Sequence, residues 1–270
     1  MKPMFDVPSV PVQRLHERLG IETPVDYPAS SLTKPLTAWK MEIDDSPILR
    51  YLYRHLRPRR HLEFGTWEGT GVLYCLEECD ATVWTINLLE GERFPNGTWA
   101  YSSNFSTDES VPGWANKITI SDTTIGCQTD AKGFIGRHYL DRGLGRRVCQ
   151  IYADSRDWDI TNYPEGFFDT CLIDGGHRPD VVANDTRKAV KVVRPGGIIM
   201  WHDFCPVPEV LESAPTARDV VHAIQRDWDW LRGRMRDLFW VKPSWILIGV
   251  HGNANTRELR GGVQDKQKAT

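Results

Sequence analysis

One run of residues, His61 to Leu88, constrains the fold more than any other part of the sequence. The apolar segment HLEF at 61–64 is followed at once by the glycine-rich stretch GTWEGTG, then by the helix-like VLYCLEEC and the apolar segment TVWTINL at 82–88. This order of strand, glycine turn, helix and strand within about thirty residues is typical of a βαβ unit. Its two strands are then parallel, and its crossover is right-handed.

The same alternation continues along the chain. The segments VCQIYA at 148–153, FDTCLID at 168–174 and GGIIMWHD at 196–203 predict three more strands, with a helix over DVVANDTRKAVKVV between the last two. DLFWVK and SWILIGV are separated only by Pro243, so we expect them to form a hairpin. The sequence therefore predicts a doubly wound α/β fold with a mostly parallel, seven-stranded sheet and one antiparallel edge strand.

This pattern divides the chain into three parts. Residues 1–43 contain several prolines and little periodicity, which predicts an N-terminal arm, whereas residues 44–252 contain all the expected strands. The polar residues 253–270 predict a disordered tail. A long segment, about 91–129, separates the second and third strands, and we expect it to be a lid or acceptor-binding insertion because such long loops are usually functional.

Composition narrows the classes of partner. The formal charge of −3 argues against the broad basic surface that nucleic acid requires. No tract reaches the roughly 18 apolar residues of a membrane helix, and the first residues lack the apolar run of a signal peptide, so we expect a cytoplasmic protein without a membrane partner. The six cysteines form no CxxC pair and are interpreted as reduced. A homo-oligomer is left open.

The glycine turn is a candidate cofactor site. Its glycines have the spacing G-x-x-x-G-x-G just before a helix, where backbone N–H groups can approach a ligand. The spacing differs from the dinucleotide pattern G-x-G-x-x-G, and the Lys of a triphosphate-binding loop is missing. Glu63 at the end of the strand would repel a pyrophosphate but suits an ammonium group, as in the amino-acid end of S-adenosylmethionine.

Glu63, Gly65 and Gly69 match the pattern acid-x-Gly-x-x-x-Gly, and from Asp44 to Val250 the sequence resembles the class I S-adenosylmethionine-dependent methyltransferases, which have a Rossmann-like fold. The resemblance implies that the cofactor lies along the turn. The residues of the turn that would bind it are Glu63, Gly65, Thr66, Trp67, Glu68 and Gly69.

The resemblance also implies cofactor contacts at the ends of the next two strands. Asn87 stands where the family usually has an acid for the ribose hydroxyls, and an amide can also accept and donate such bonds. Asp154 and Ser155 follow the third strand, where the family contacts the adenine. The alternative for these two residues is a helix cap.

Two further strands end in polar residues. Asp174 and His177 lie in LIDGGH, and His202 and Asp203 end GGIIMWHD. Because the carboxyl ends of neighbouring parallel strands face one crevice, we expect these four side chains to form a cluster. Two carboxylates and an imidazole can hold a divalent metal, which would bind an acceptor hydroxyl and lower its pKa.

The pattern D-G-G-H followed by R-P-G-G-I-I-M-W-H-D resembles one branch of the family, the metal-dependent sugar and natural-product O-methyltransferases related to macrolide-sugar methyltransferases and the cephalosporin-hydroxylation protein. The resemblance implies that Asp174 and Asp203 are metal ligands, that Asp174 also borders the cofactor, and that His177 is the general base. His202 departs from the branch, which often has an acid there. It is predicted as a third ligand to Mg²⁺ or Mn²⁺, and the alternatives are a metal-free base or a donor to Asp203.

The sequence therefore predicts an S-adenosylmethionine-dependent O-methyltransferase acting on a hydroxyl of a small molecule, a sugar or a secondary metabolite. Its catalytic candidates are His177 and His202, and its metal-ligand candidates are Asp174, His202 and Asp203. One alternative is an NAD-dependent oxidoreductase on the same fold, which the glycine spacing disfavours. Another is a non-catalytic, cofactor-binding partner protein, which would have no need of the acids and histidines at the strand ends.

Overall fold

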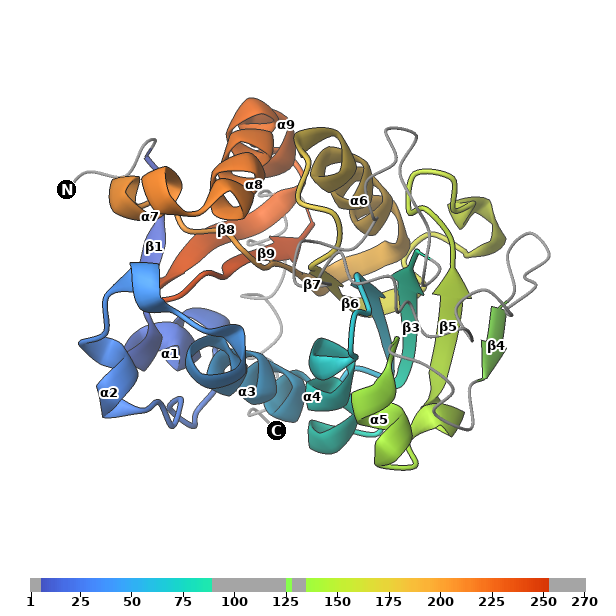
Figure 1. Ribbon diagram of the computed structural model, residues 1–270. Helices are drawn as coiled ribbons and strands as arrows, with labels where there is room; N and C mark the ends of the chain where they lie inside the picture. Colours follow the sequence, from blue (N-terminus) through green and yellow to red (C-terminus); the bar gives the residue numbers. More distant parts are fainter. Residues whose placement is uncertain (1–5, 89–124, 128–134, 253–270) are drawn as a thin grey trace, which may run out of the picture.

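In the computed structural model, which describes residues 6–88, 125–127 and 135–252, one sheet forms the centre of the molecule (Figure 1). Within these residues it has nine strands in the order β1-β8-β9-β7-β6-β2-β3-β5-β4. The strands are β1 (Ser9–Pro11), β2 (Arg60–Phe64), β3 (Thr82–Asn87), β4 (Ile125–Cys127), β5 (Val148–Tyr152), β6 (Phe168–Ile173), β7 (Val193–Trp201), β8 (Met235–Lys242) and β9 (Leu247–His251).

Helices cover both faces of the sheet (Figure 1). One face carries α1 (Leu15–Leu19), α2 (Ala29–Leu32), α3 (Ser46–Leu56), α4 (Thr70–Glu78) and α5 (Arg137–Asp141). The other carries α6 (Pro179–Val192), α7 (Pro208–Ser213), α8 (Pro215–Arg226) and α9 (Trp228–Arg232). Short helical turns are η1 (Val12–Arg14), η2 (Leu36–Ala38), η3 (Met41–Asp45), η4 (Gly145–Arg147) and η5 (Ile160–Asn162). None of the helices described here is long and apolar enough to cross a membrane.

Each face of the sheet has its own apolar core. Alternate residues of a strand point to opposite faces, so Ile199 and Trp201 of β7 pack with the core under α6 and α8, whereas Ile198 and Met200 pack with the core under α3 and α4. Burying such a side chain stabilises the fold by about 1.5–3 kcal/mol. This two-sided burial explains why the central strands read as nearly continuous apolar runs.

The predicted doubly wound α/β fold is confirmed, and all seven expected strands are present. The number of strands in the sheet and the position of the antiparallel strand differ from the prediction. The antiparallel strand β9 lies between β7 and β8 and is not an edge strand, because β9 pairs with β7 and the tight β8–β9 hairpin then places β8 outside it. Two short strands complete the sheet: β1 pairs with β8 in parallel, and β4 pairs with β5 in antiparallel fashion.

The predicted arm, residues 1–43, therefore contributes a strand to the sheet and covers the otherwise open edge of β8. The boundary at residue 43 stays a prediction. Most of the expected lid at about 91–129 and the whole tail at 253–270 lie outside the described residues; of the lid, β4 at Ile125–Cys127 is described.

The glycine turn fits against the end of a neighbouring strand. Gly65 has a φ of +95°, and a Cβ at this position would lie 2.1 Å from the carbonyl oxygen of Asp174. The strand ends are held together by hydrogen bonds from Gly65 N to Ile86 O and from Asp174 N to Phe64 O, both 2.9 Å. Only a glycine allows the first turn and the end of β6 to approach so closely.

We predict that Gly65→Ala destabilises the fold by about 2 kcal/mol or more, because the substitution combines a left-handed φ with a clash against backbone that cannot move alone. Gly143→Ala is the matched control. Gly143 also has a positive φ, +69°, but a Cβ there would meet nothing within 4 Å. Urea denaturation measures both variants, and equal losses of stability would show that the Asp174 contact is unimportant.

Candidate active site

Asn87 at the end of β3 stabilises the glycine turn through hydrogen bonds with its backbone. Its side-chain oxygen accepts hydrogen bonds from the backbone N–H groups of Thr66 and Trp67, each at 3.0 Å, and its amide donates to Leu88 O at 2.7 Å. The oxygen that we expected to meet a ribose hydroxyl is therefore engaged with the turn. Asn87 stabilises the conformation of the turn, in which Trp67 has a positive φ of 47°.

The polar side chains of the turn also bond within the protein. The Thr66 hydroxyl is buried and lies 2.7 Å from the Thr85 hydroxyl, and it accepts a bond from Gln150. Glu68 forms an ion pair with Arg137 of α5. Both side chains therefore support the turn, and their expected contact with the cofactor stays a prediction.

Glu63 lies beneath the start of α4. Its carboxylate would be 2.8 Å from a Cβ at Gly71, and its Oε2 atom accepts no hydrogen bond from the described residues. Burial, together with the charge of Asp174, raises the pKa of Glu63 well above its usual value. The structure thus places this acid under the turn as a group that readily holds a proton.

Asp154 and Ser155 form the turn after β5. The Asp154 carboxylate accepts a hydrogen bond from the backbone of Arg156 at 2.9 Å and forms an ion pair with its guanidinium. The hydrogen bond from the Arg156 side chain outweighs burial, which acts in the opposite direction, and leaves the pKa of Asp154 below its usual value. The backbone oxygen of Ser155 accepts from Lys188 of α6 at 2.6 Å. The geometry matches the capping alternative, with a turn in place of a helix.

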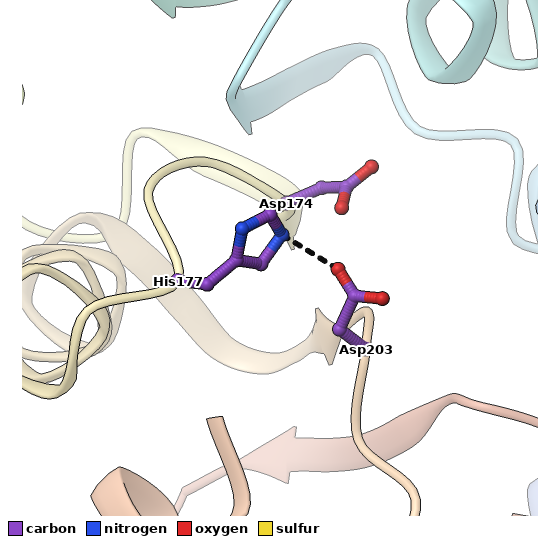
Figure 2. A group of neighbouring side chains, drawn as sticks. All are labelled: Asp174, His177 and Asp203. Atoms are coloured by element: carbon purple, nitrogen blue, oxygen red, sulfur yellow. Dashed lines mark ion pairs between the residues drawn. The ribbon is translucent and has the colours of Figure 1, made fainter. Parts of the chain in front are cut away.

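The acids and histidines at the ends of β6 and β7 do come together (Figure 2). His177 Nε2 lies 2.6 Å from Asp203 Oδ2, and the His177 side chain is 38% exposed. Asp174, His177 and Asp203 each offer one ligand atom, and these three atoms lie within 4.8 Å of one another. Asp203 has a positive φ of 56°, a conformation that costs about 1–3 kcal/mol and often occurs at functional sites.

His202 lies beside the cluster in the protein interior, with its Nδ1 atom 3.5 Å from Asp203 Oδ2. It is only 7% exposed; its Nδ1 atom lies 3.1 Å from Asp174 Oδ1, and its Nε2 atom lies 3.2 Å from Asp45 Oδ2. The Nδ1 contact has the distance of an ion pair but lacks the alignment of a hydrogen bond. His202 therefore borders the cluster. Among the described residues, the group whose ligand atoms lie close enough to hold a metal ion contains His177 and not His202.

The cluster shifts the protonation of its members. Burial alone would lower the pKa of His202, but Asp174 and Asp203 raise it well above its usual value. Burial also opposes ionisation of Asp203, yet His202 and His177 hold the pKa of that carboxyl far below its usual range. Burial would also lower the pKa of His177, but its bond to Asp203 together with the charges of Asp203 and Asp174 raises it. The two imidazoles thus favour an ionised Asp203.

Two buried acids adjoin the cluster. Asp45 contacts His202 from the N-terminal segment, and no local pattern marks this contact, because its partner is 157 residues away. Asp185 of α6 accepts from its neighbour Asn184 at 2.8 Å, while its Oδ2 atom, beneath Gly175, has no hydrogen-bond partner among the described residues.

The glycine turn and the acid–histidine cluster share one edge of an open, mostly parallel sheet, which is where Rossmann-like folds bind their ligands. Residues 62–204, more than half of the chain, match the family described as "Methyltransferase domain". The chain belongs to this methyltransferase family. A comparison with curated protein sequences found no match.

Solved methyltransferase structures share the fold. A methyltransferase from Podospora anserina, bound to S-adenosylhomocysteine, is 12% identical with a TM-score of 0.50, covering 92% of this chain and 91% of that one. An O-methyltransferase from Bacillus cereus with the same ligand is 18% identical, with a TM-score of 0.47 and coverage of 82% and 86%. The MycE methyltransferase of the mycinamycin pathway, in complex with Mg and S-adenosylhomocysteine, is 11% identical, with a TM-score of 0.47 and coverage of 92% and 56%.

We predict that Asp185→Asn stabilises the protein at neutral and alkaline pH. Burial raises the pKa of Asp185 from 3.8 to about 6 despite its bonds to Ser155 and Asn184. The folded wild type therefore loses stability as the pH rises from about 4 to about 6, by up to about 3 kcal/mol, because the unfolded chain ionises first. The amide cannot ionise, so the variant should gain this stability above pH 6 and resemble the wild type near pH 4.

Urea denaturation at several pH values measures this difference. Asp219→Asn is the control, since the Asp219 side chain on α8 is 40% exposed and should leave the profile unchanged. A variant of Asp185 that is less stable than the wild type at pH 8 would contradict an Asp185 whose ionisation is opposed mainly by burial.

Proposed function

We propose that this protein transfers the methyl group of S-adenosylmethionine to a hydroxyl oxygen of a small molecule. The observation that carries the proposal is His177, a partly exposed imidazole held by Asp203 at 2.6 Å. It lies on the edge of the sheet where Gly65 of the glycine turn meets Asp174. A base beside a cofactor turn is the arrangement that methyl transfer to a hydroxyl requires.

The cofactor is proposed to lie along the turn from Glu63 to Gly69, with Asp174 at its border. Because Asn87, Thr66 and Glu68 bond within the protein, we infer that they support the turn and that its backbone contacts the cofactor. Adenine and ribose contacts at Asp154, Ser155 and Asn87 remain proposals. The S-adenosylhomocysteine in the similar solved structures supports this choice of cofactor.

The proton of the acceptor hydroxyl is proposed to pass to His177. Its Nε2 atom donates to Asp203, which leaves Nδ1 to accept the proton, while the hydroxyl oxygen bonds to the methyl carbon and the carbon–sulfur bond breaks. The products are a methyl ether, S-adenosylhomocysteine and an imidazolium that the Asp203 carboxylate stabilises. His202 is too buried to meet an acceptor and is proposed to orient the two acids.

The donor set of Asp174, His177 and Asp203 fits a divalent cation such as Mg²⁺ or Mn²⁺, because two carboxylates and one imidazole converge on one point. A bound cation would lower the pKa of a coordinated hydroxyl. His202, the ligand first expected, would then act from outside this set. Coordination through Nε2 would replace the His177 contact with Asp203, so the roles of His177 as base and as ligand compete.

The class of acceptor and the location of the protein are also proposals. The acceptor class is a sugar or secondary metabolite, as in the resembling branch, and a cytoplasmic location is retained from the sequence. The charge of −3 disfavours nucleic acid as the acceptor. Because the chain belongs to the methyltransferase family, we no longer propose an oxidoreductase. A non-catalytic partner is disfavoured by the strained, ion-paired Asp203.

We predict that His177→Gln retains cofactor binding but lowers turnover by roughly 100-fold or more, because it removes the general base. Calorimetry measures S-adenosylmethionine affinity, and release of S-adenosylhomocysteine with a panel of sugars, phenols and catechols measures turnover. His222→Gln, at an exposed position on α8, is the control. Full activity of the His177 variant would remove it as the base, and a folded wild type that does not bind millimolar S-adenosylmethionine would reject the proposed function.

We also predict that Mn²⁺ binds to the wild type and that Asp174→Asn or Asp203→Asn weakens this binding at least about tenfold, because each variant removes a charged ligand. Electron paramagnetic resonance of free Mn²⁺ measures the affinity. Asp180→Asn, an exposed acid at the start of α6, should have no effect. Turnover that persists in EDTA would show that the reaction needs no metal, even where the ion binds.

A further inference from the structure

Asp45 is a fully buried acid that connects three distant parts of the chain. It is the last residue of η3 (Met41–Asp45). This turn ends the N-terminal segment, residues 6–45, which precedes α3. Its Oδ1 atom accepts hydrogen bonds from the Trp39 indole at 2.8 Å and from the backbone N–H of Trp245 at 3.1 Å. Its Oδ2 atom lies 3.2 Å from His202 Nε2.

These contacts hold both sides of the bend that presents Asp203. On one side, Asp45 binds the side chain of His202. On the other, Trp245, whose N–H binds Asp45, accepts a hydrogen bond from Phe204 N through its carbonyl oxygen at 3.0 Å. Asp203 lies between them with a φ of 56°, a conformation that persists only when its surroundings impose it.

The neighbouring acid, Asp44, contacts a different set of residues. Its carboxylate accepts bonds from the Ser31 hydroxyl at 2.6 Å and from Lys40 N at 2.8 Å, and it forms an ion pair with Lys34. All of these partners belong to the N-terminal segment itself. Asp44 therefore folds this segment, whereas Asp45 connects the segment to the strand ends, and the two adjacent acids form a matched pair for comparison.

We propose that Asp45 is a positioning residue of the methyl-transfer site, which holds His202 and the 202–204 bend so that Asp203 meets His177. This inference rests on the proposed function. It makes the N-terminal segment part of the active-site framework and separates Asp45 from the residues that touch the acceptor. Loss of Asp45 should misplace Asp203 and slow the chemical step without reducing cofactor affinity.

The test compares Asp45→Asn with Asp44→Asn. Asp45→Asn keeps the size of the side chain and an oxygen for Trp39 and Trp245, but it removes the charge that faces His202. We expect kcat to fall about tenfold to a hundredfold, as is typical when a supporting contact of a site is lost, with KM for the acceptor and the affinity for S-adenosylmethionine nearly unchanged. Asp44→Asn should lower thermal stability and leave kcat of the folded protein unchanged.

A second readout needs no acceptor. An imidazole N–H bonded to a buried carboxylate gives a downfield proton signal in NMR, which is assigned to His202 by its loss in His202→Gln. We expect Asp45→Asn to lose this signal and Asp44→Asn to keep it. A signal and a kcat that both survive in Asp45→Asn would overturn the inference, and so would equal losses of kcat in the two variants.

Two further outcomes are informative. If Asp45→Asn does not fold, Trp39→Phe decides the matter, because it removes one of the two donors that fix the Asp45 carboxylate in its position against His202. A lowered kcat in Trp39→Phe supports the inference, and an unchanged kcat counts against it. A wild type that transfers no methyl group rejects the proposed function, whereas the NMR comparison still tests the contact between Asp45 and His202.

Discussion

The close approach of two strand ends, at Gly65 and Asp174, is the constraint on which the rest of the site depends. The carbonyl of Asp174 occupies the space where any other residue at position 65 would have its Cβ. The pairing of β2 with β6 therefore continues to the last residue of each strand. As a result, the glycine turn and the D-G-G-H loop begin at the same point, and a cofactor on the first lies beside the imidazole of the second.

Several acids lie at this edge of the sheet, and their surroundings shift their pKa values in two opposite directions. Asp203 is paired with imidazoles, and its pKa is lowered despite burial. Glu63 and Asp185 each have an oxygen without a hydrogen-bond donor among the described residues, and burial raises their pKa values. Glu63 therefore favours the protonated form, whereas Asp185, with a pKa of about 6, ionises below neutral pH at a cost in stability. The acid that this edge holds in its ionised form is Asp203, which lies 2.6 Å from His177 and 3.5 Å from His202.

The sequence predicted the parts of this structure that depend on local patterns. Long apolar runs identified the seven main strands, and the strand ends identified the cluster. The three-residue strands β1 and β4 have no such signal, because only their partners make them strands. Asn87 was expected to bind a ribose because its position resembles that of a family acid, yet two N–H groups of the turn take its oxygen. Asp45 resembled a helix cap, while its partner His202 is 157 residues away.

The departure of His202 from the resembling branch follows from the same geometry. His202 and Asp203 have different main partners: His202 Nε2 lies 3.2 Å from the buried Asp45, and Asp203 lies 2.6 Å from His177. An acid at position 202 would bring its carboxylate against both Asp45 and Asp174, and such a buried group of three like charges is strongly unfavourable. An imidazole places a nitrogen toward each acid and removes this repulsion. The histidine at the end of β7 is therefore the counterpart of Asp45, which the N-terminal segment contributes.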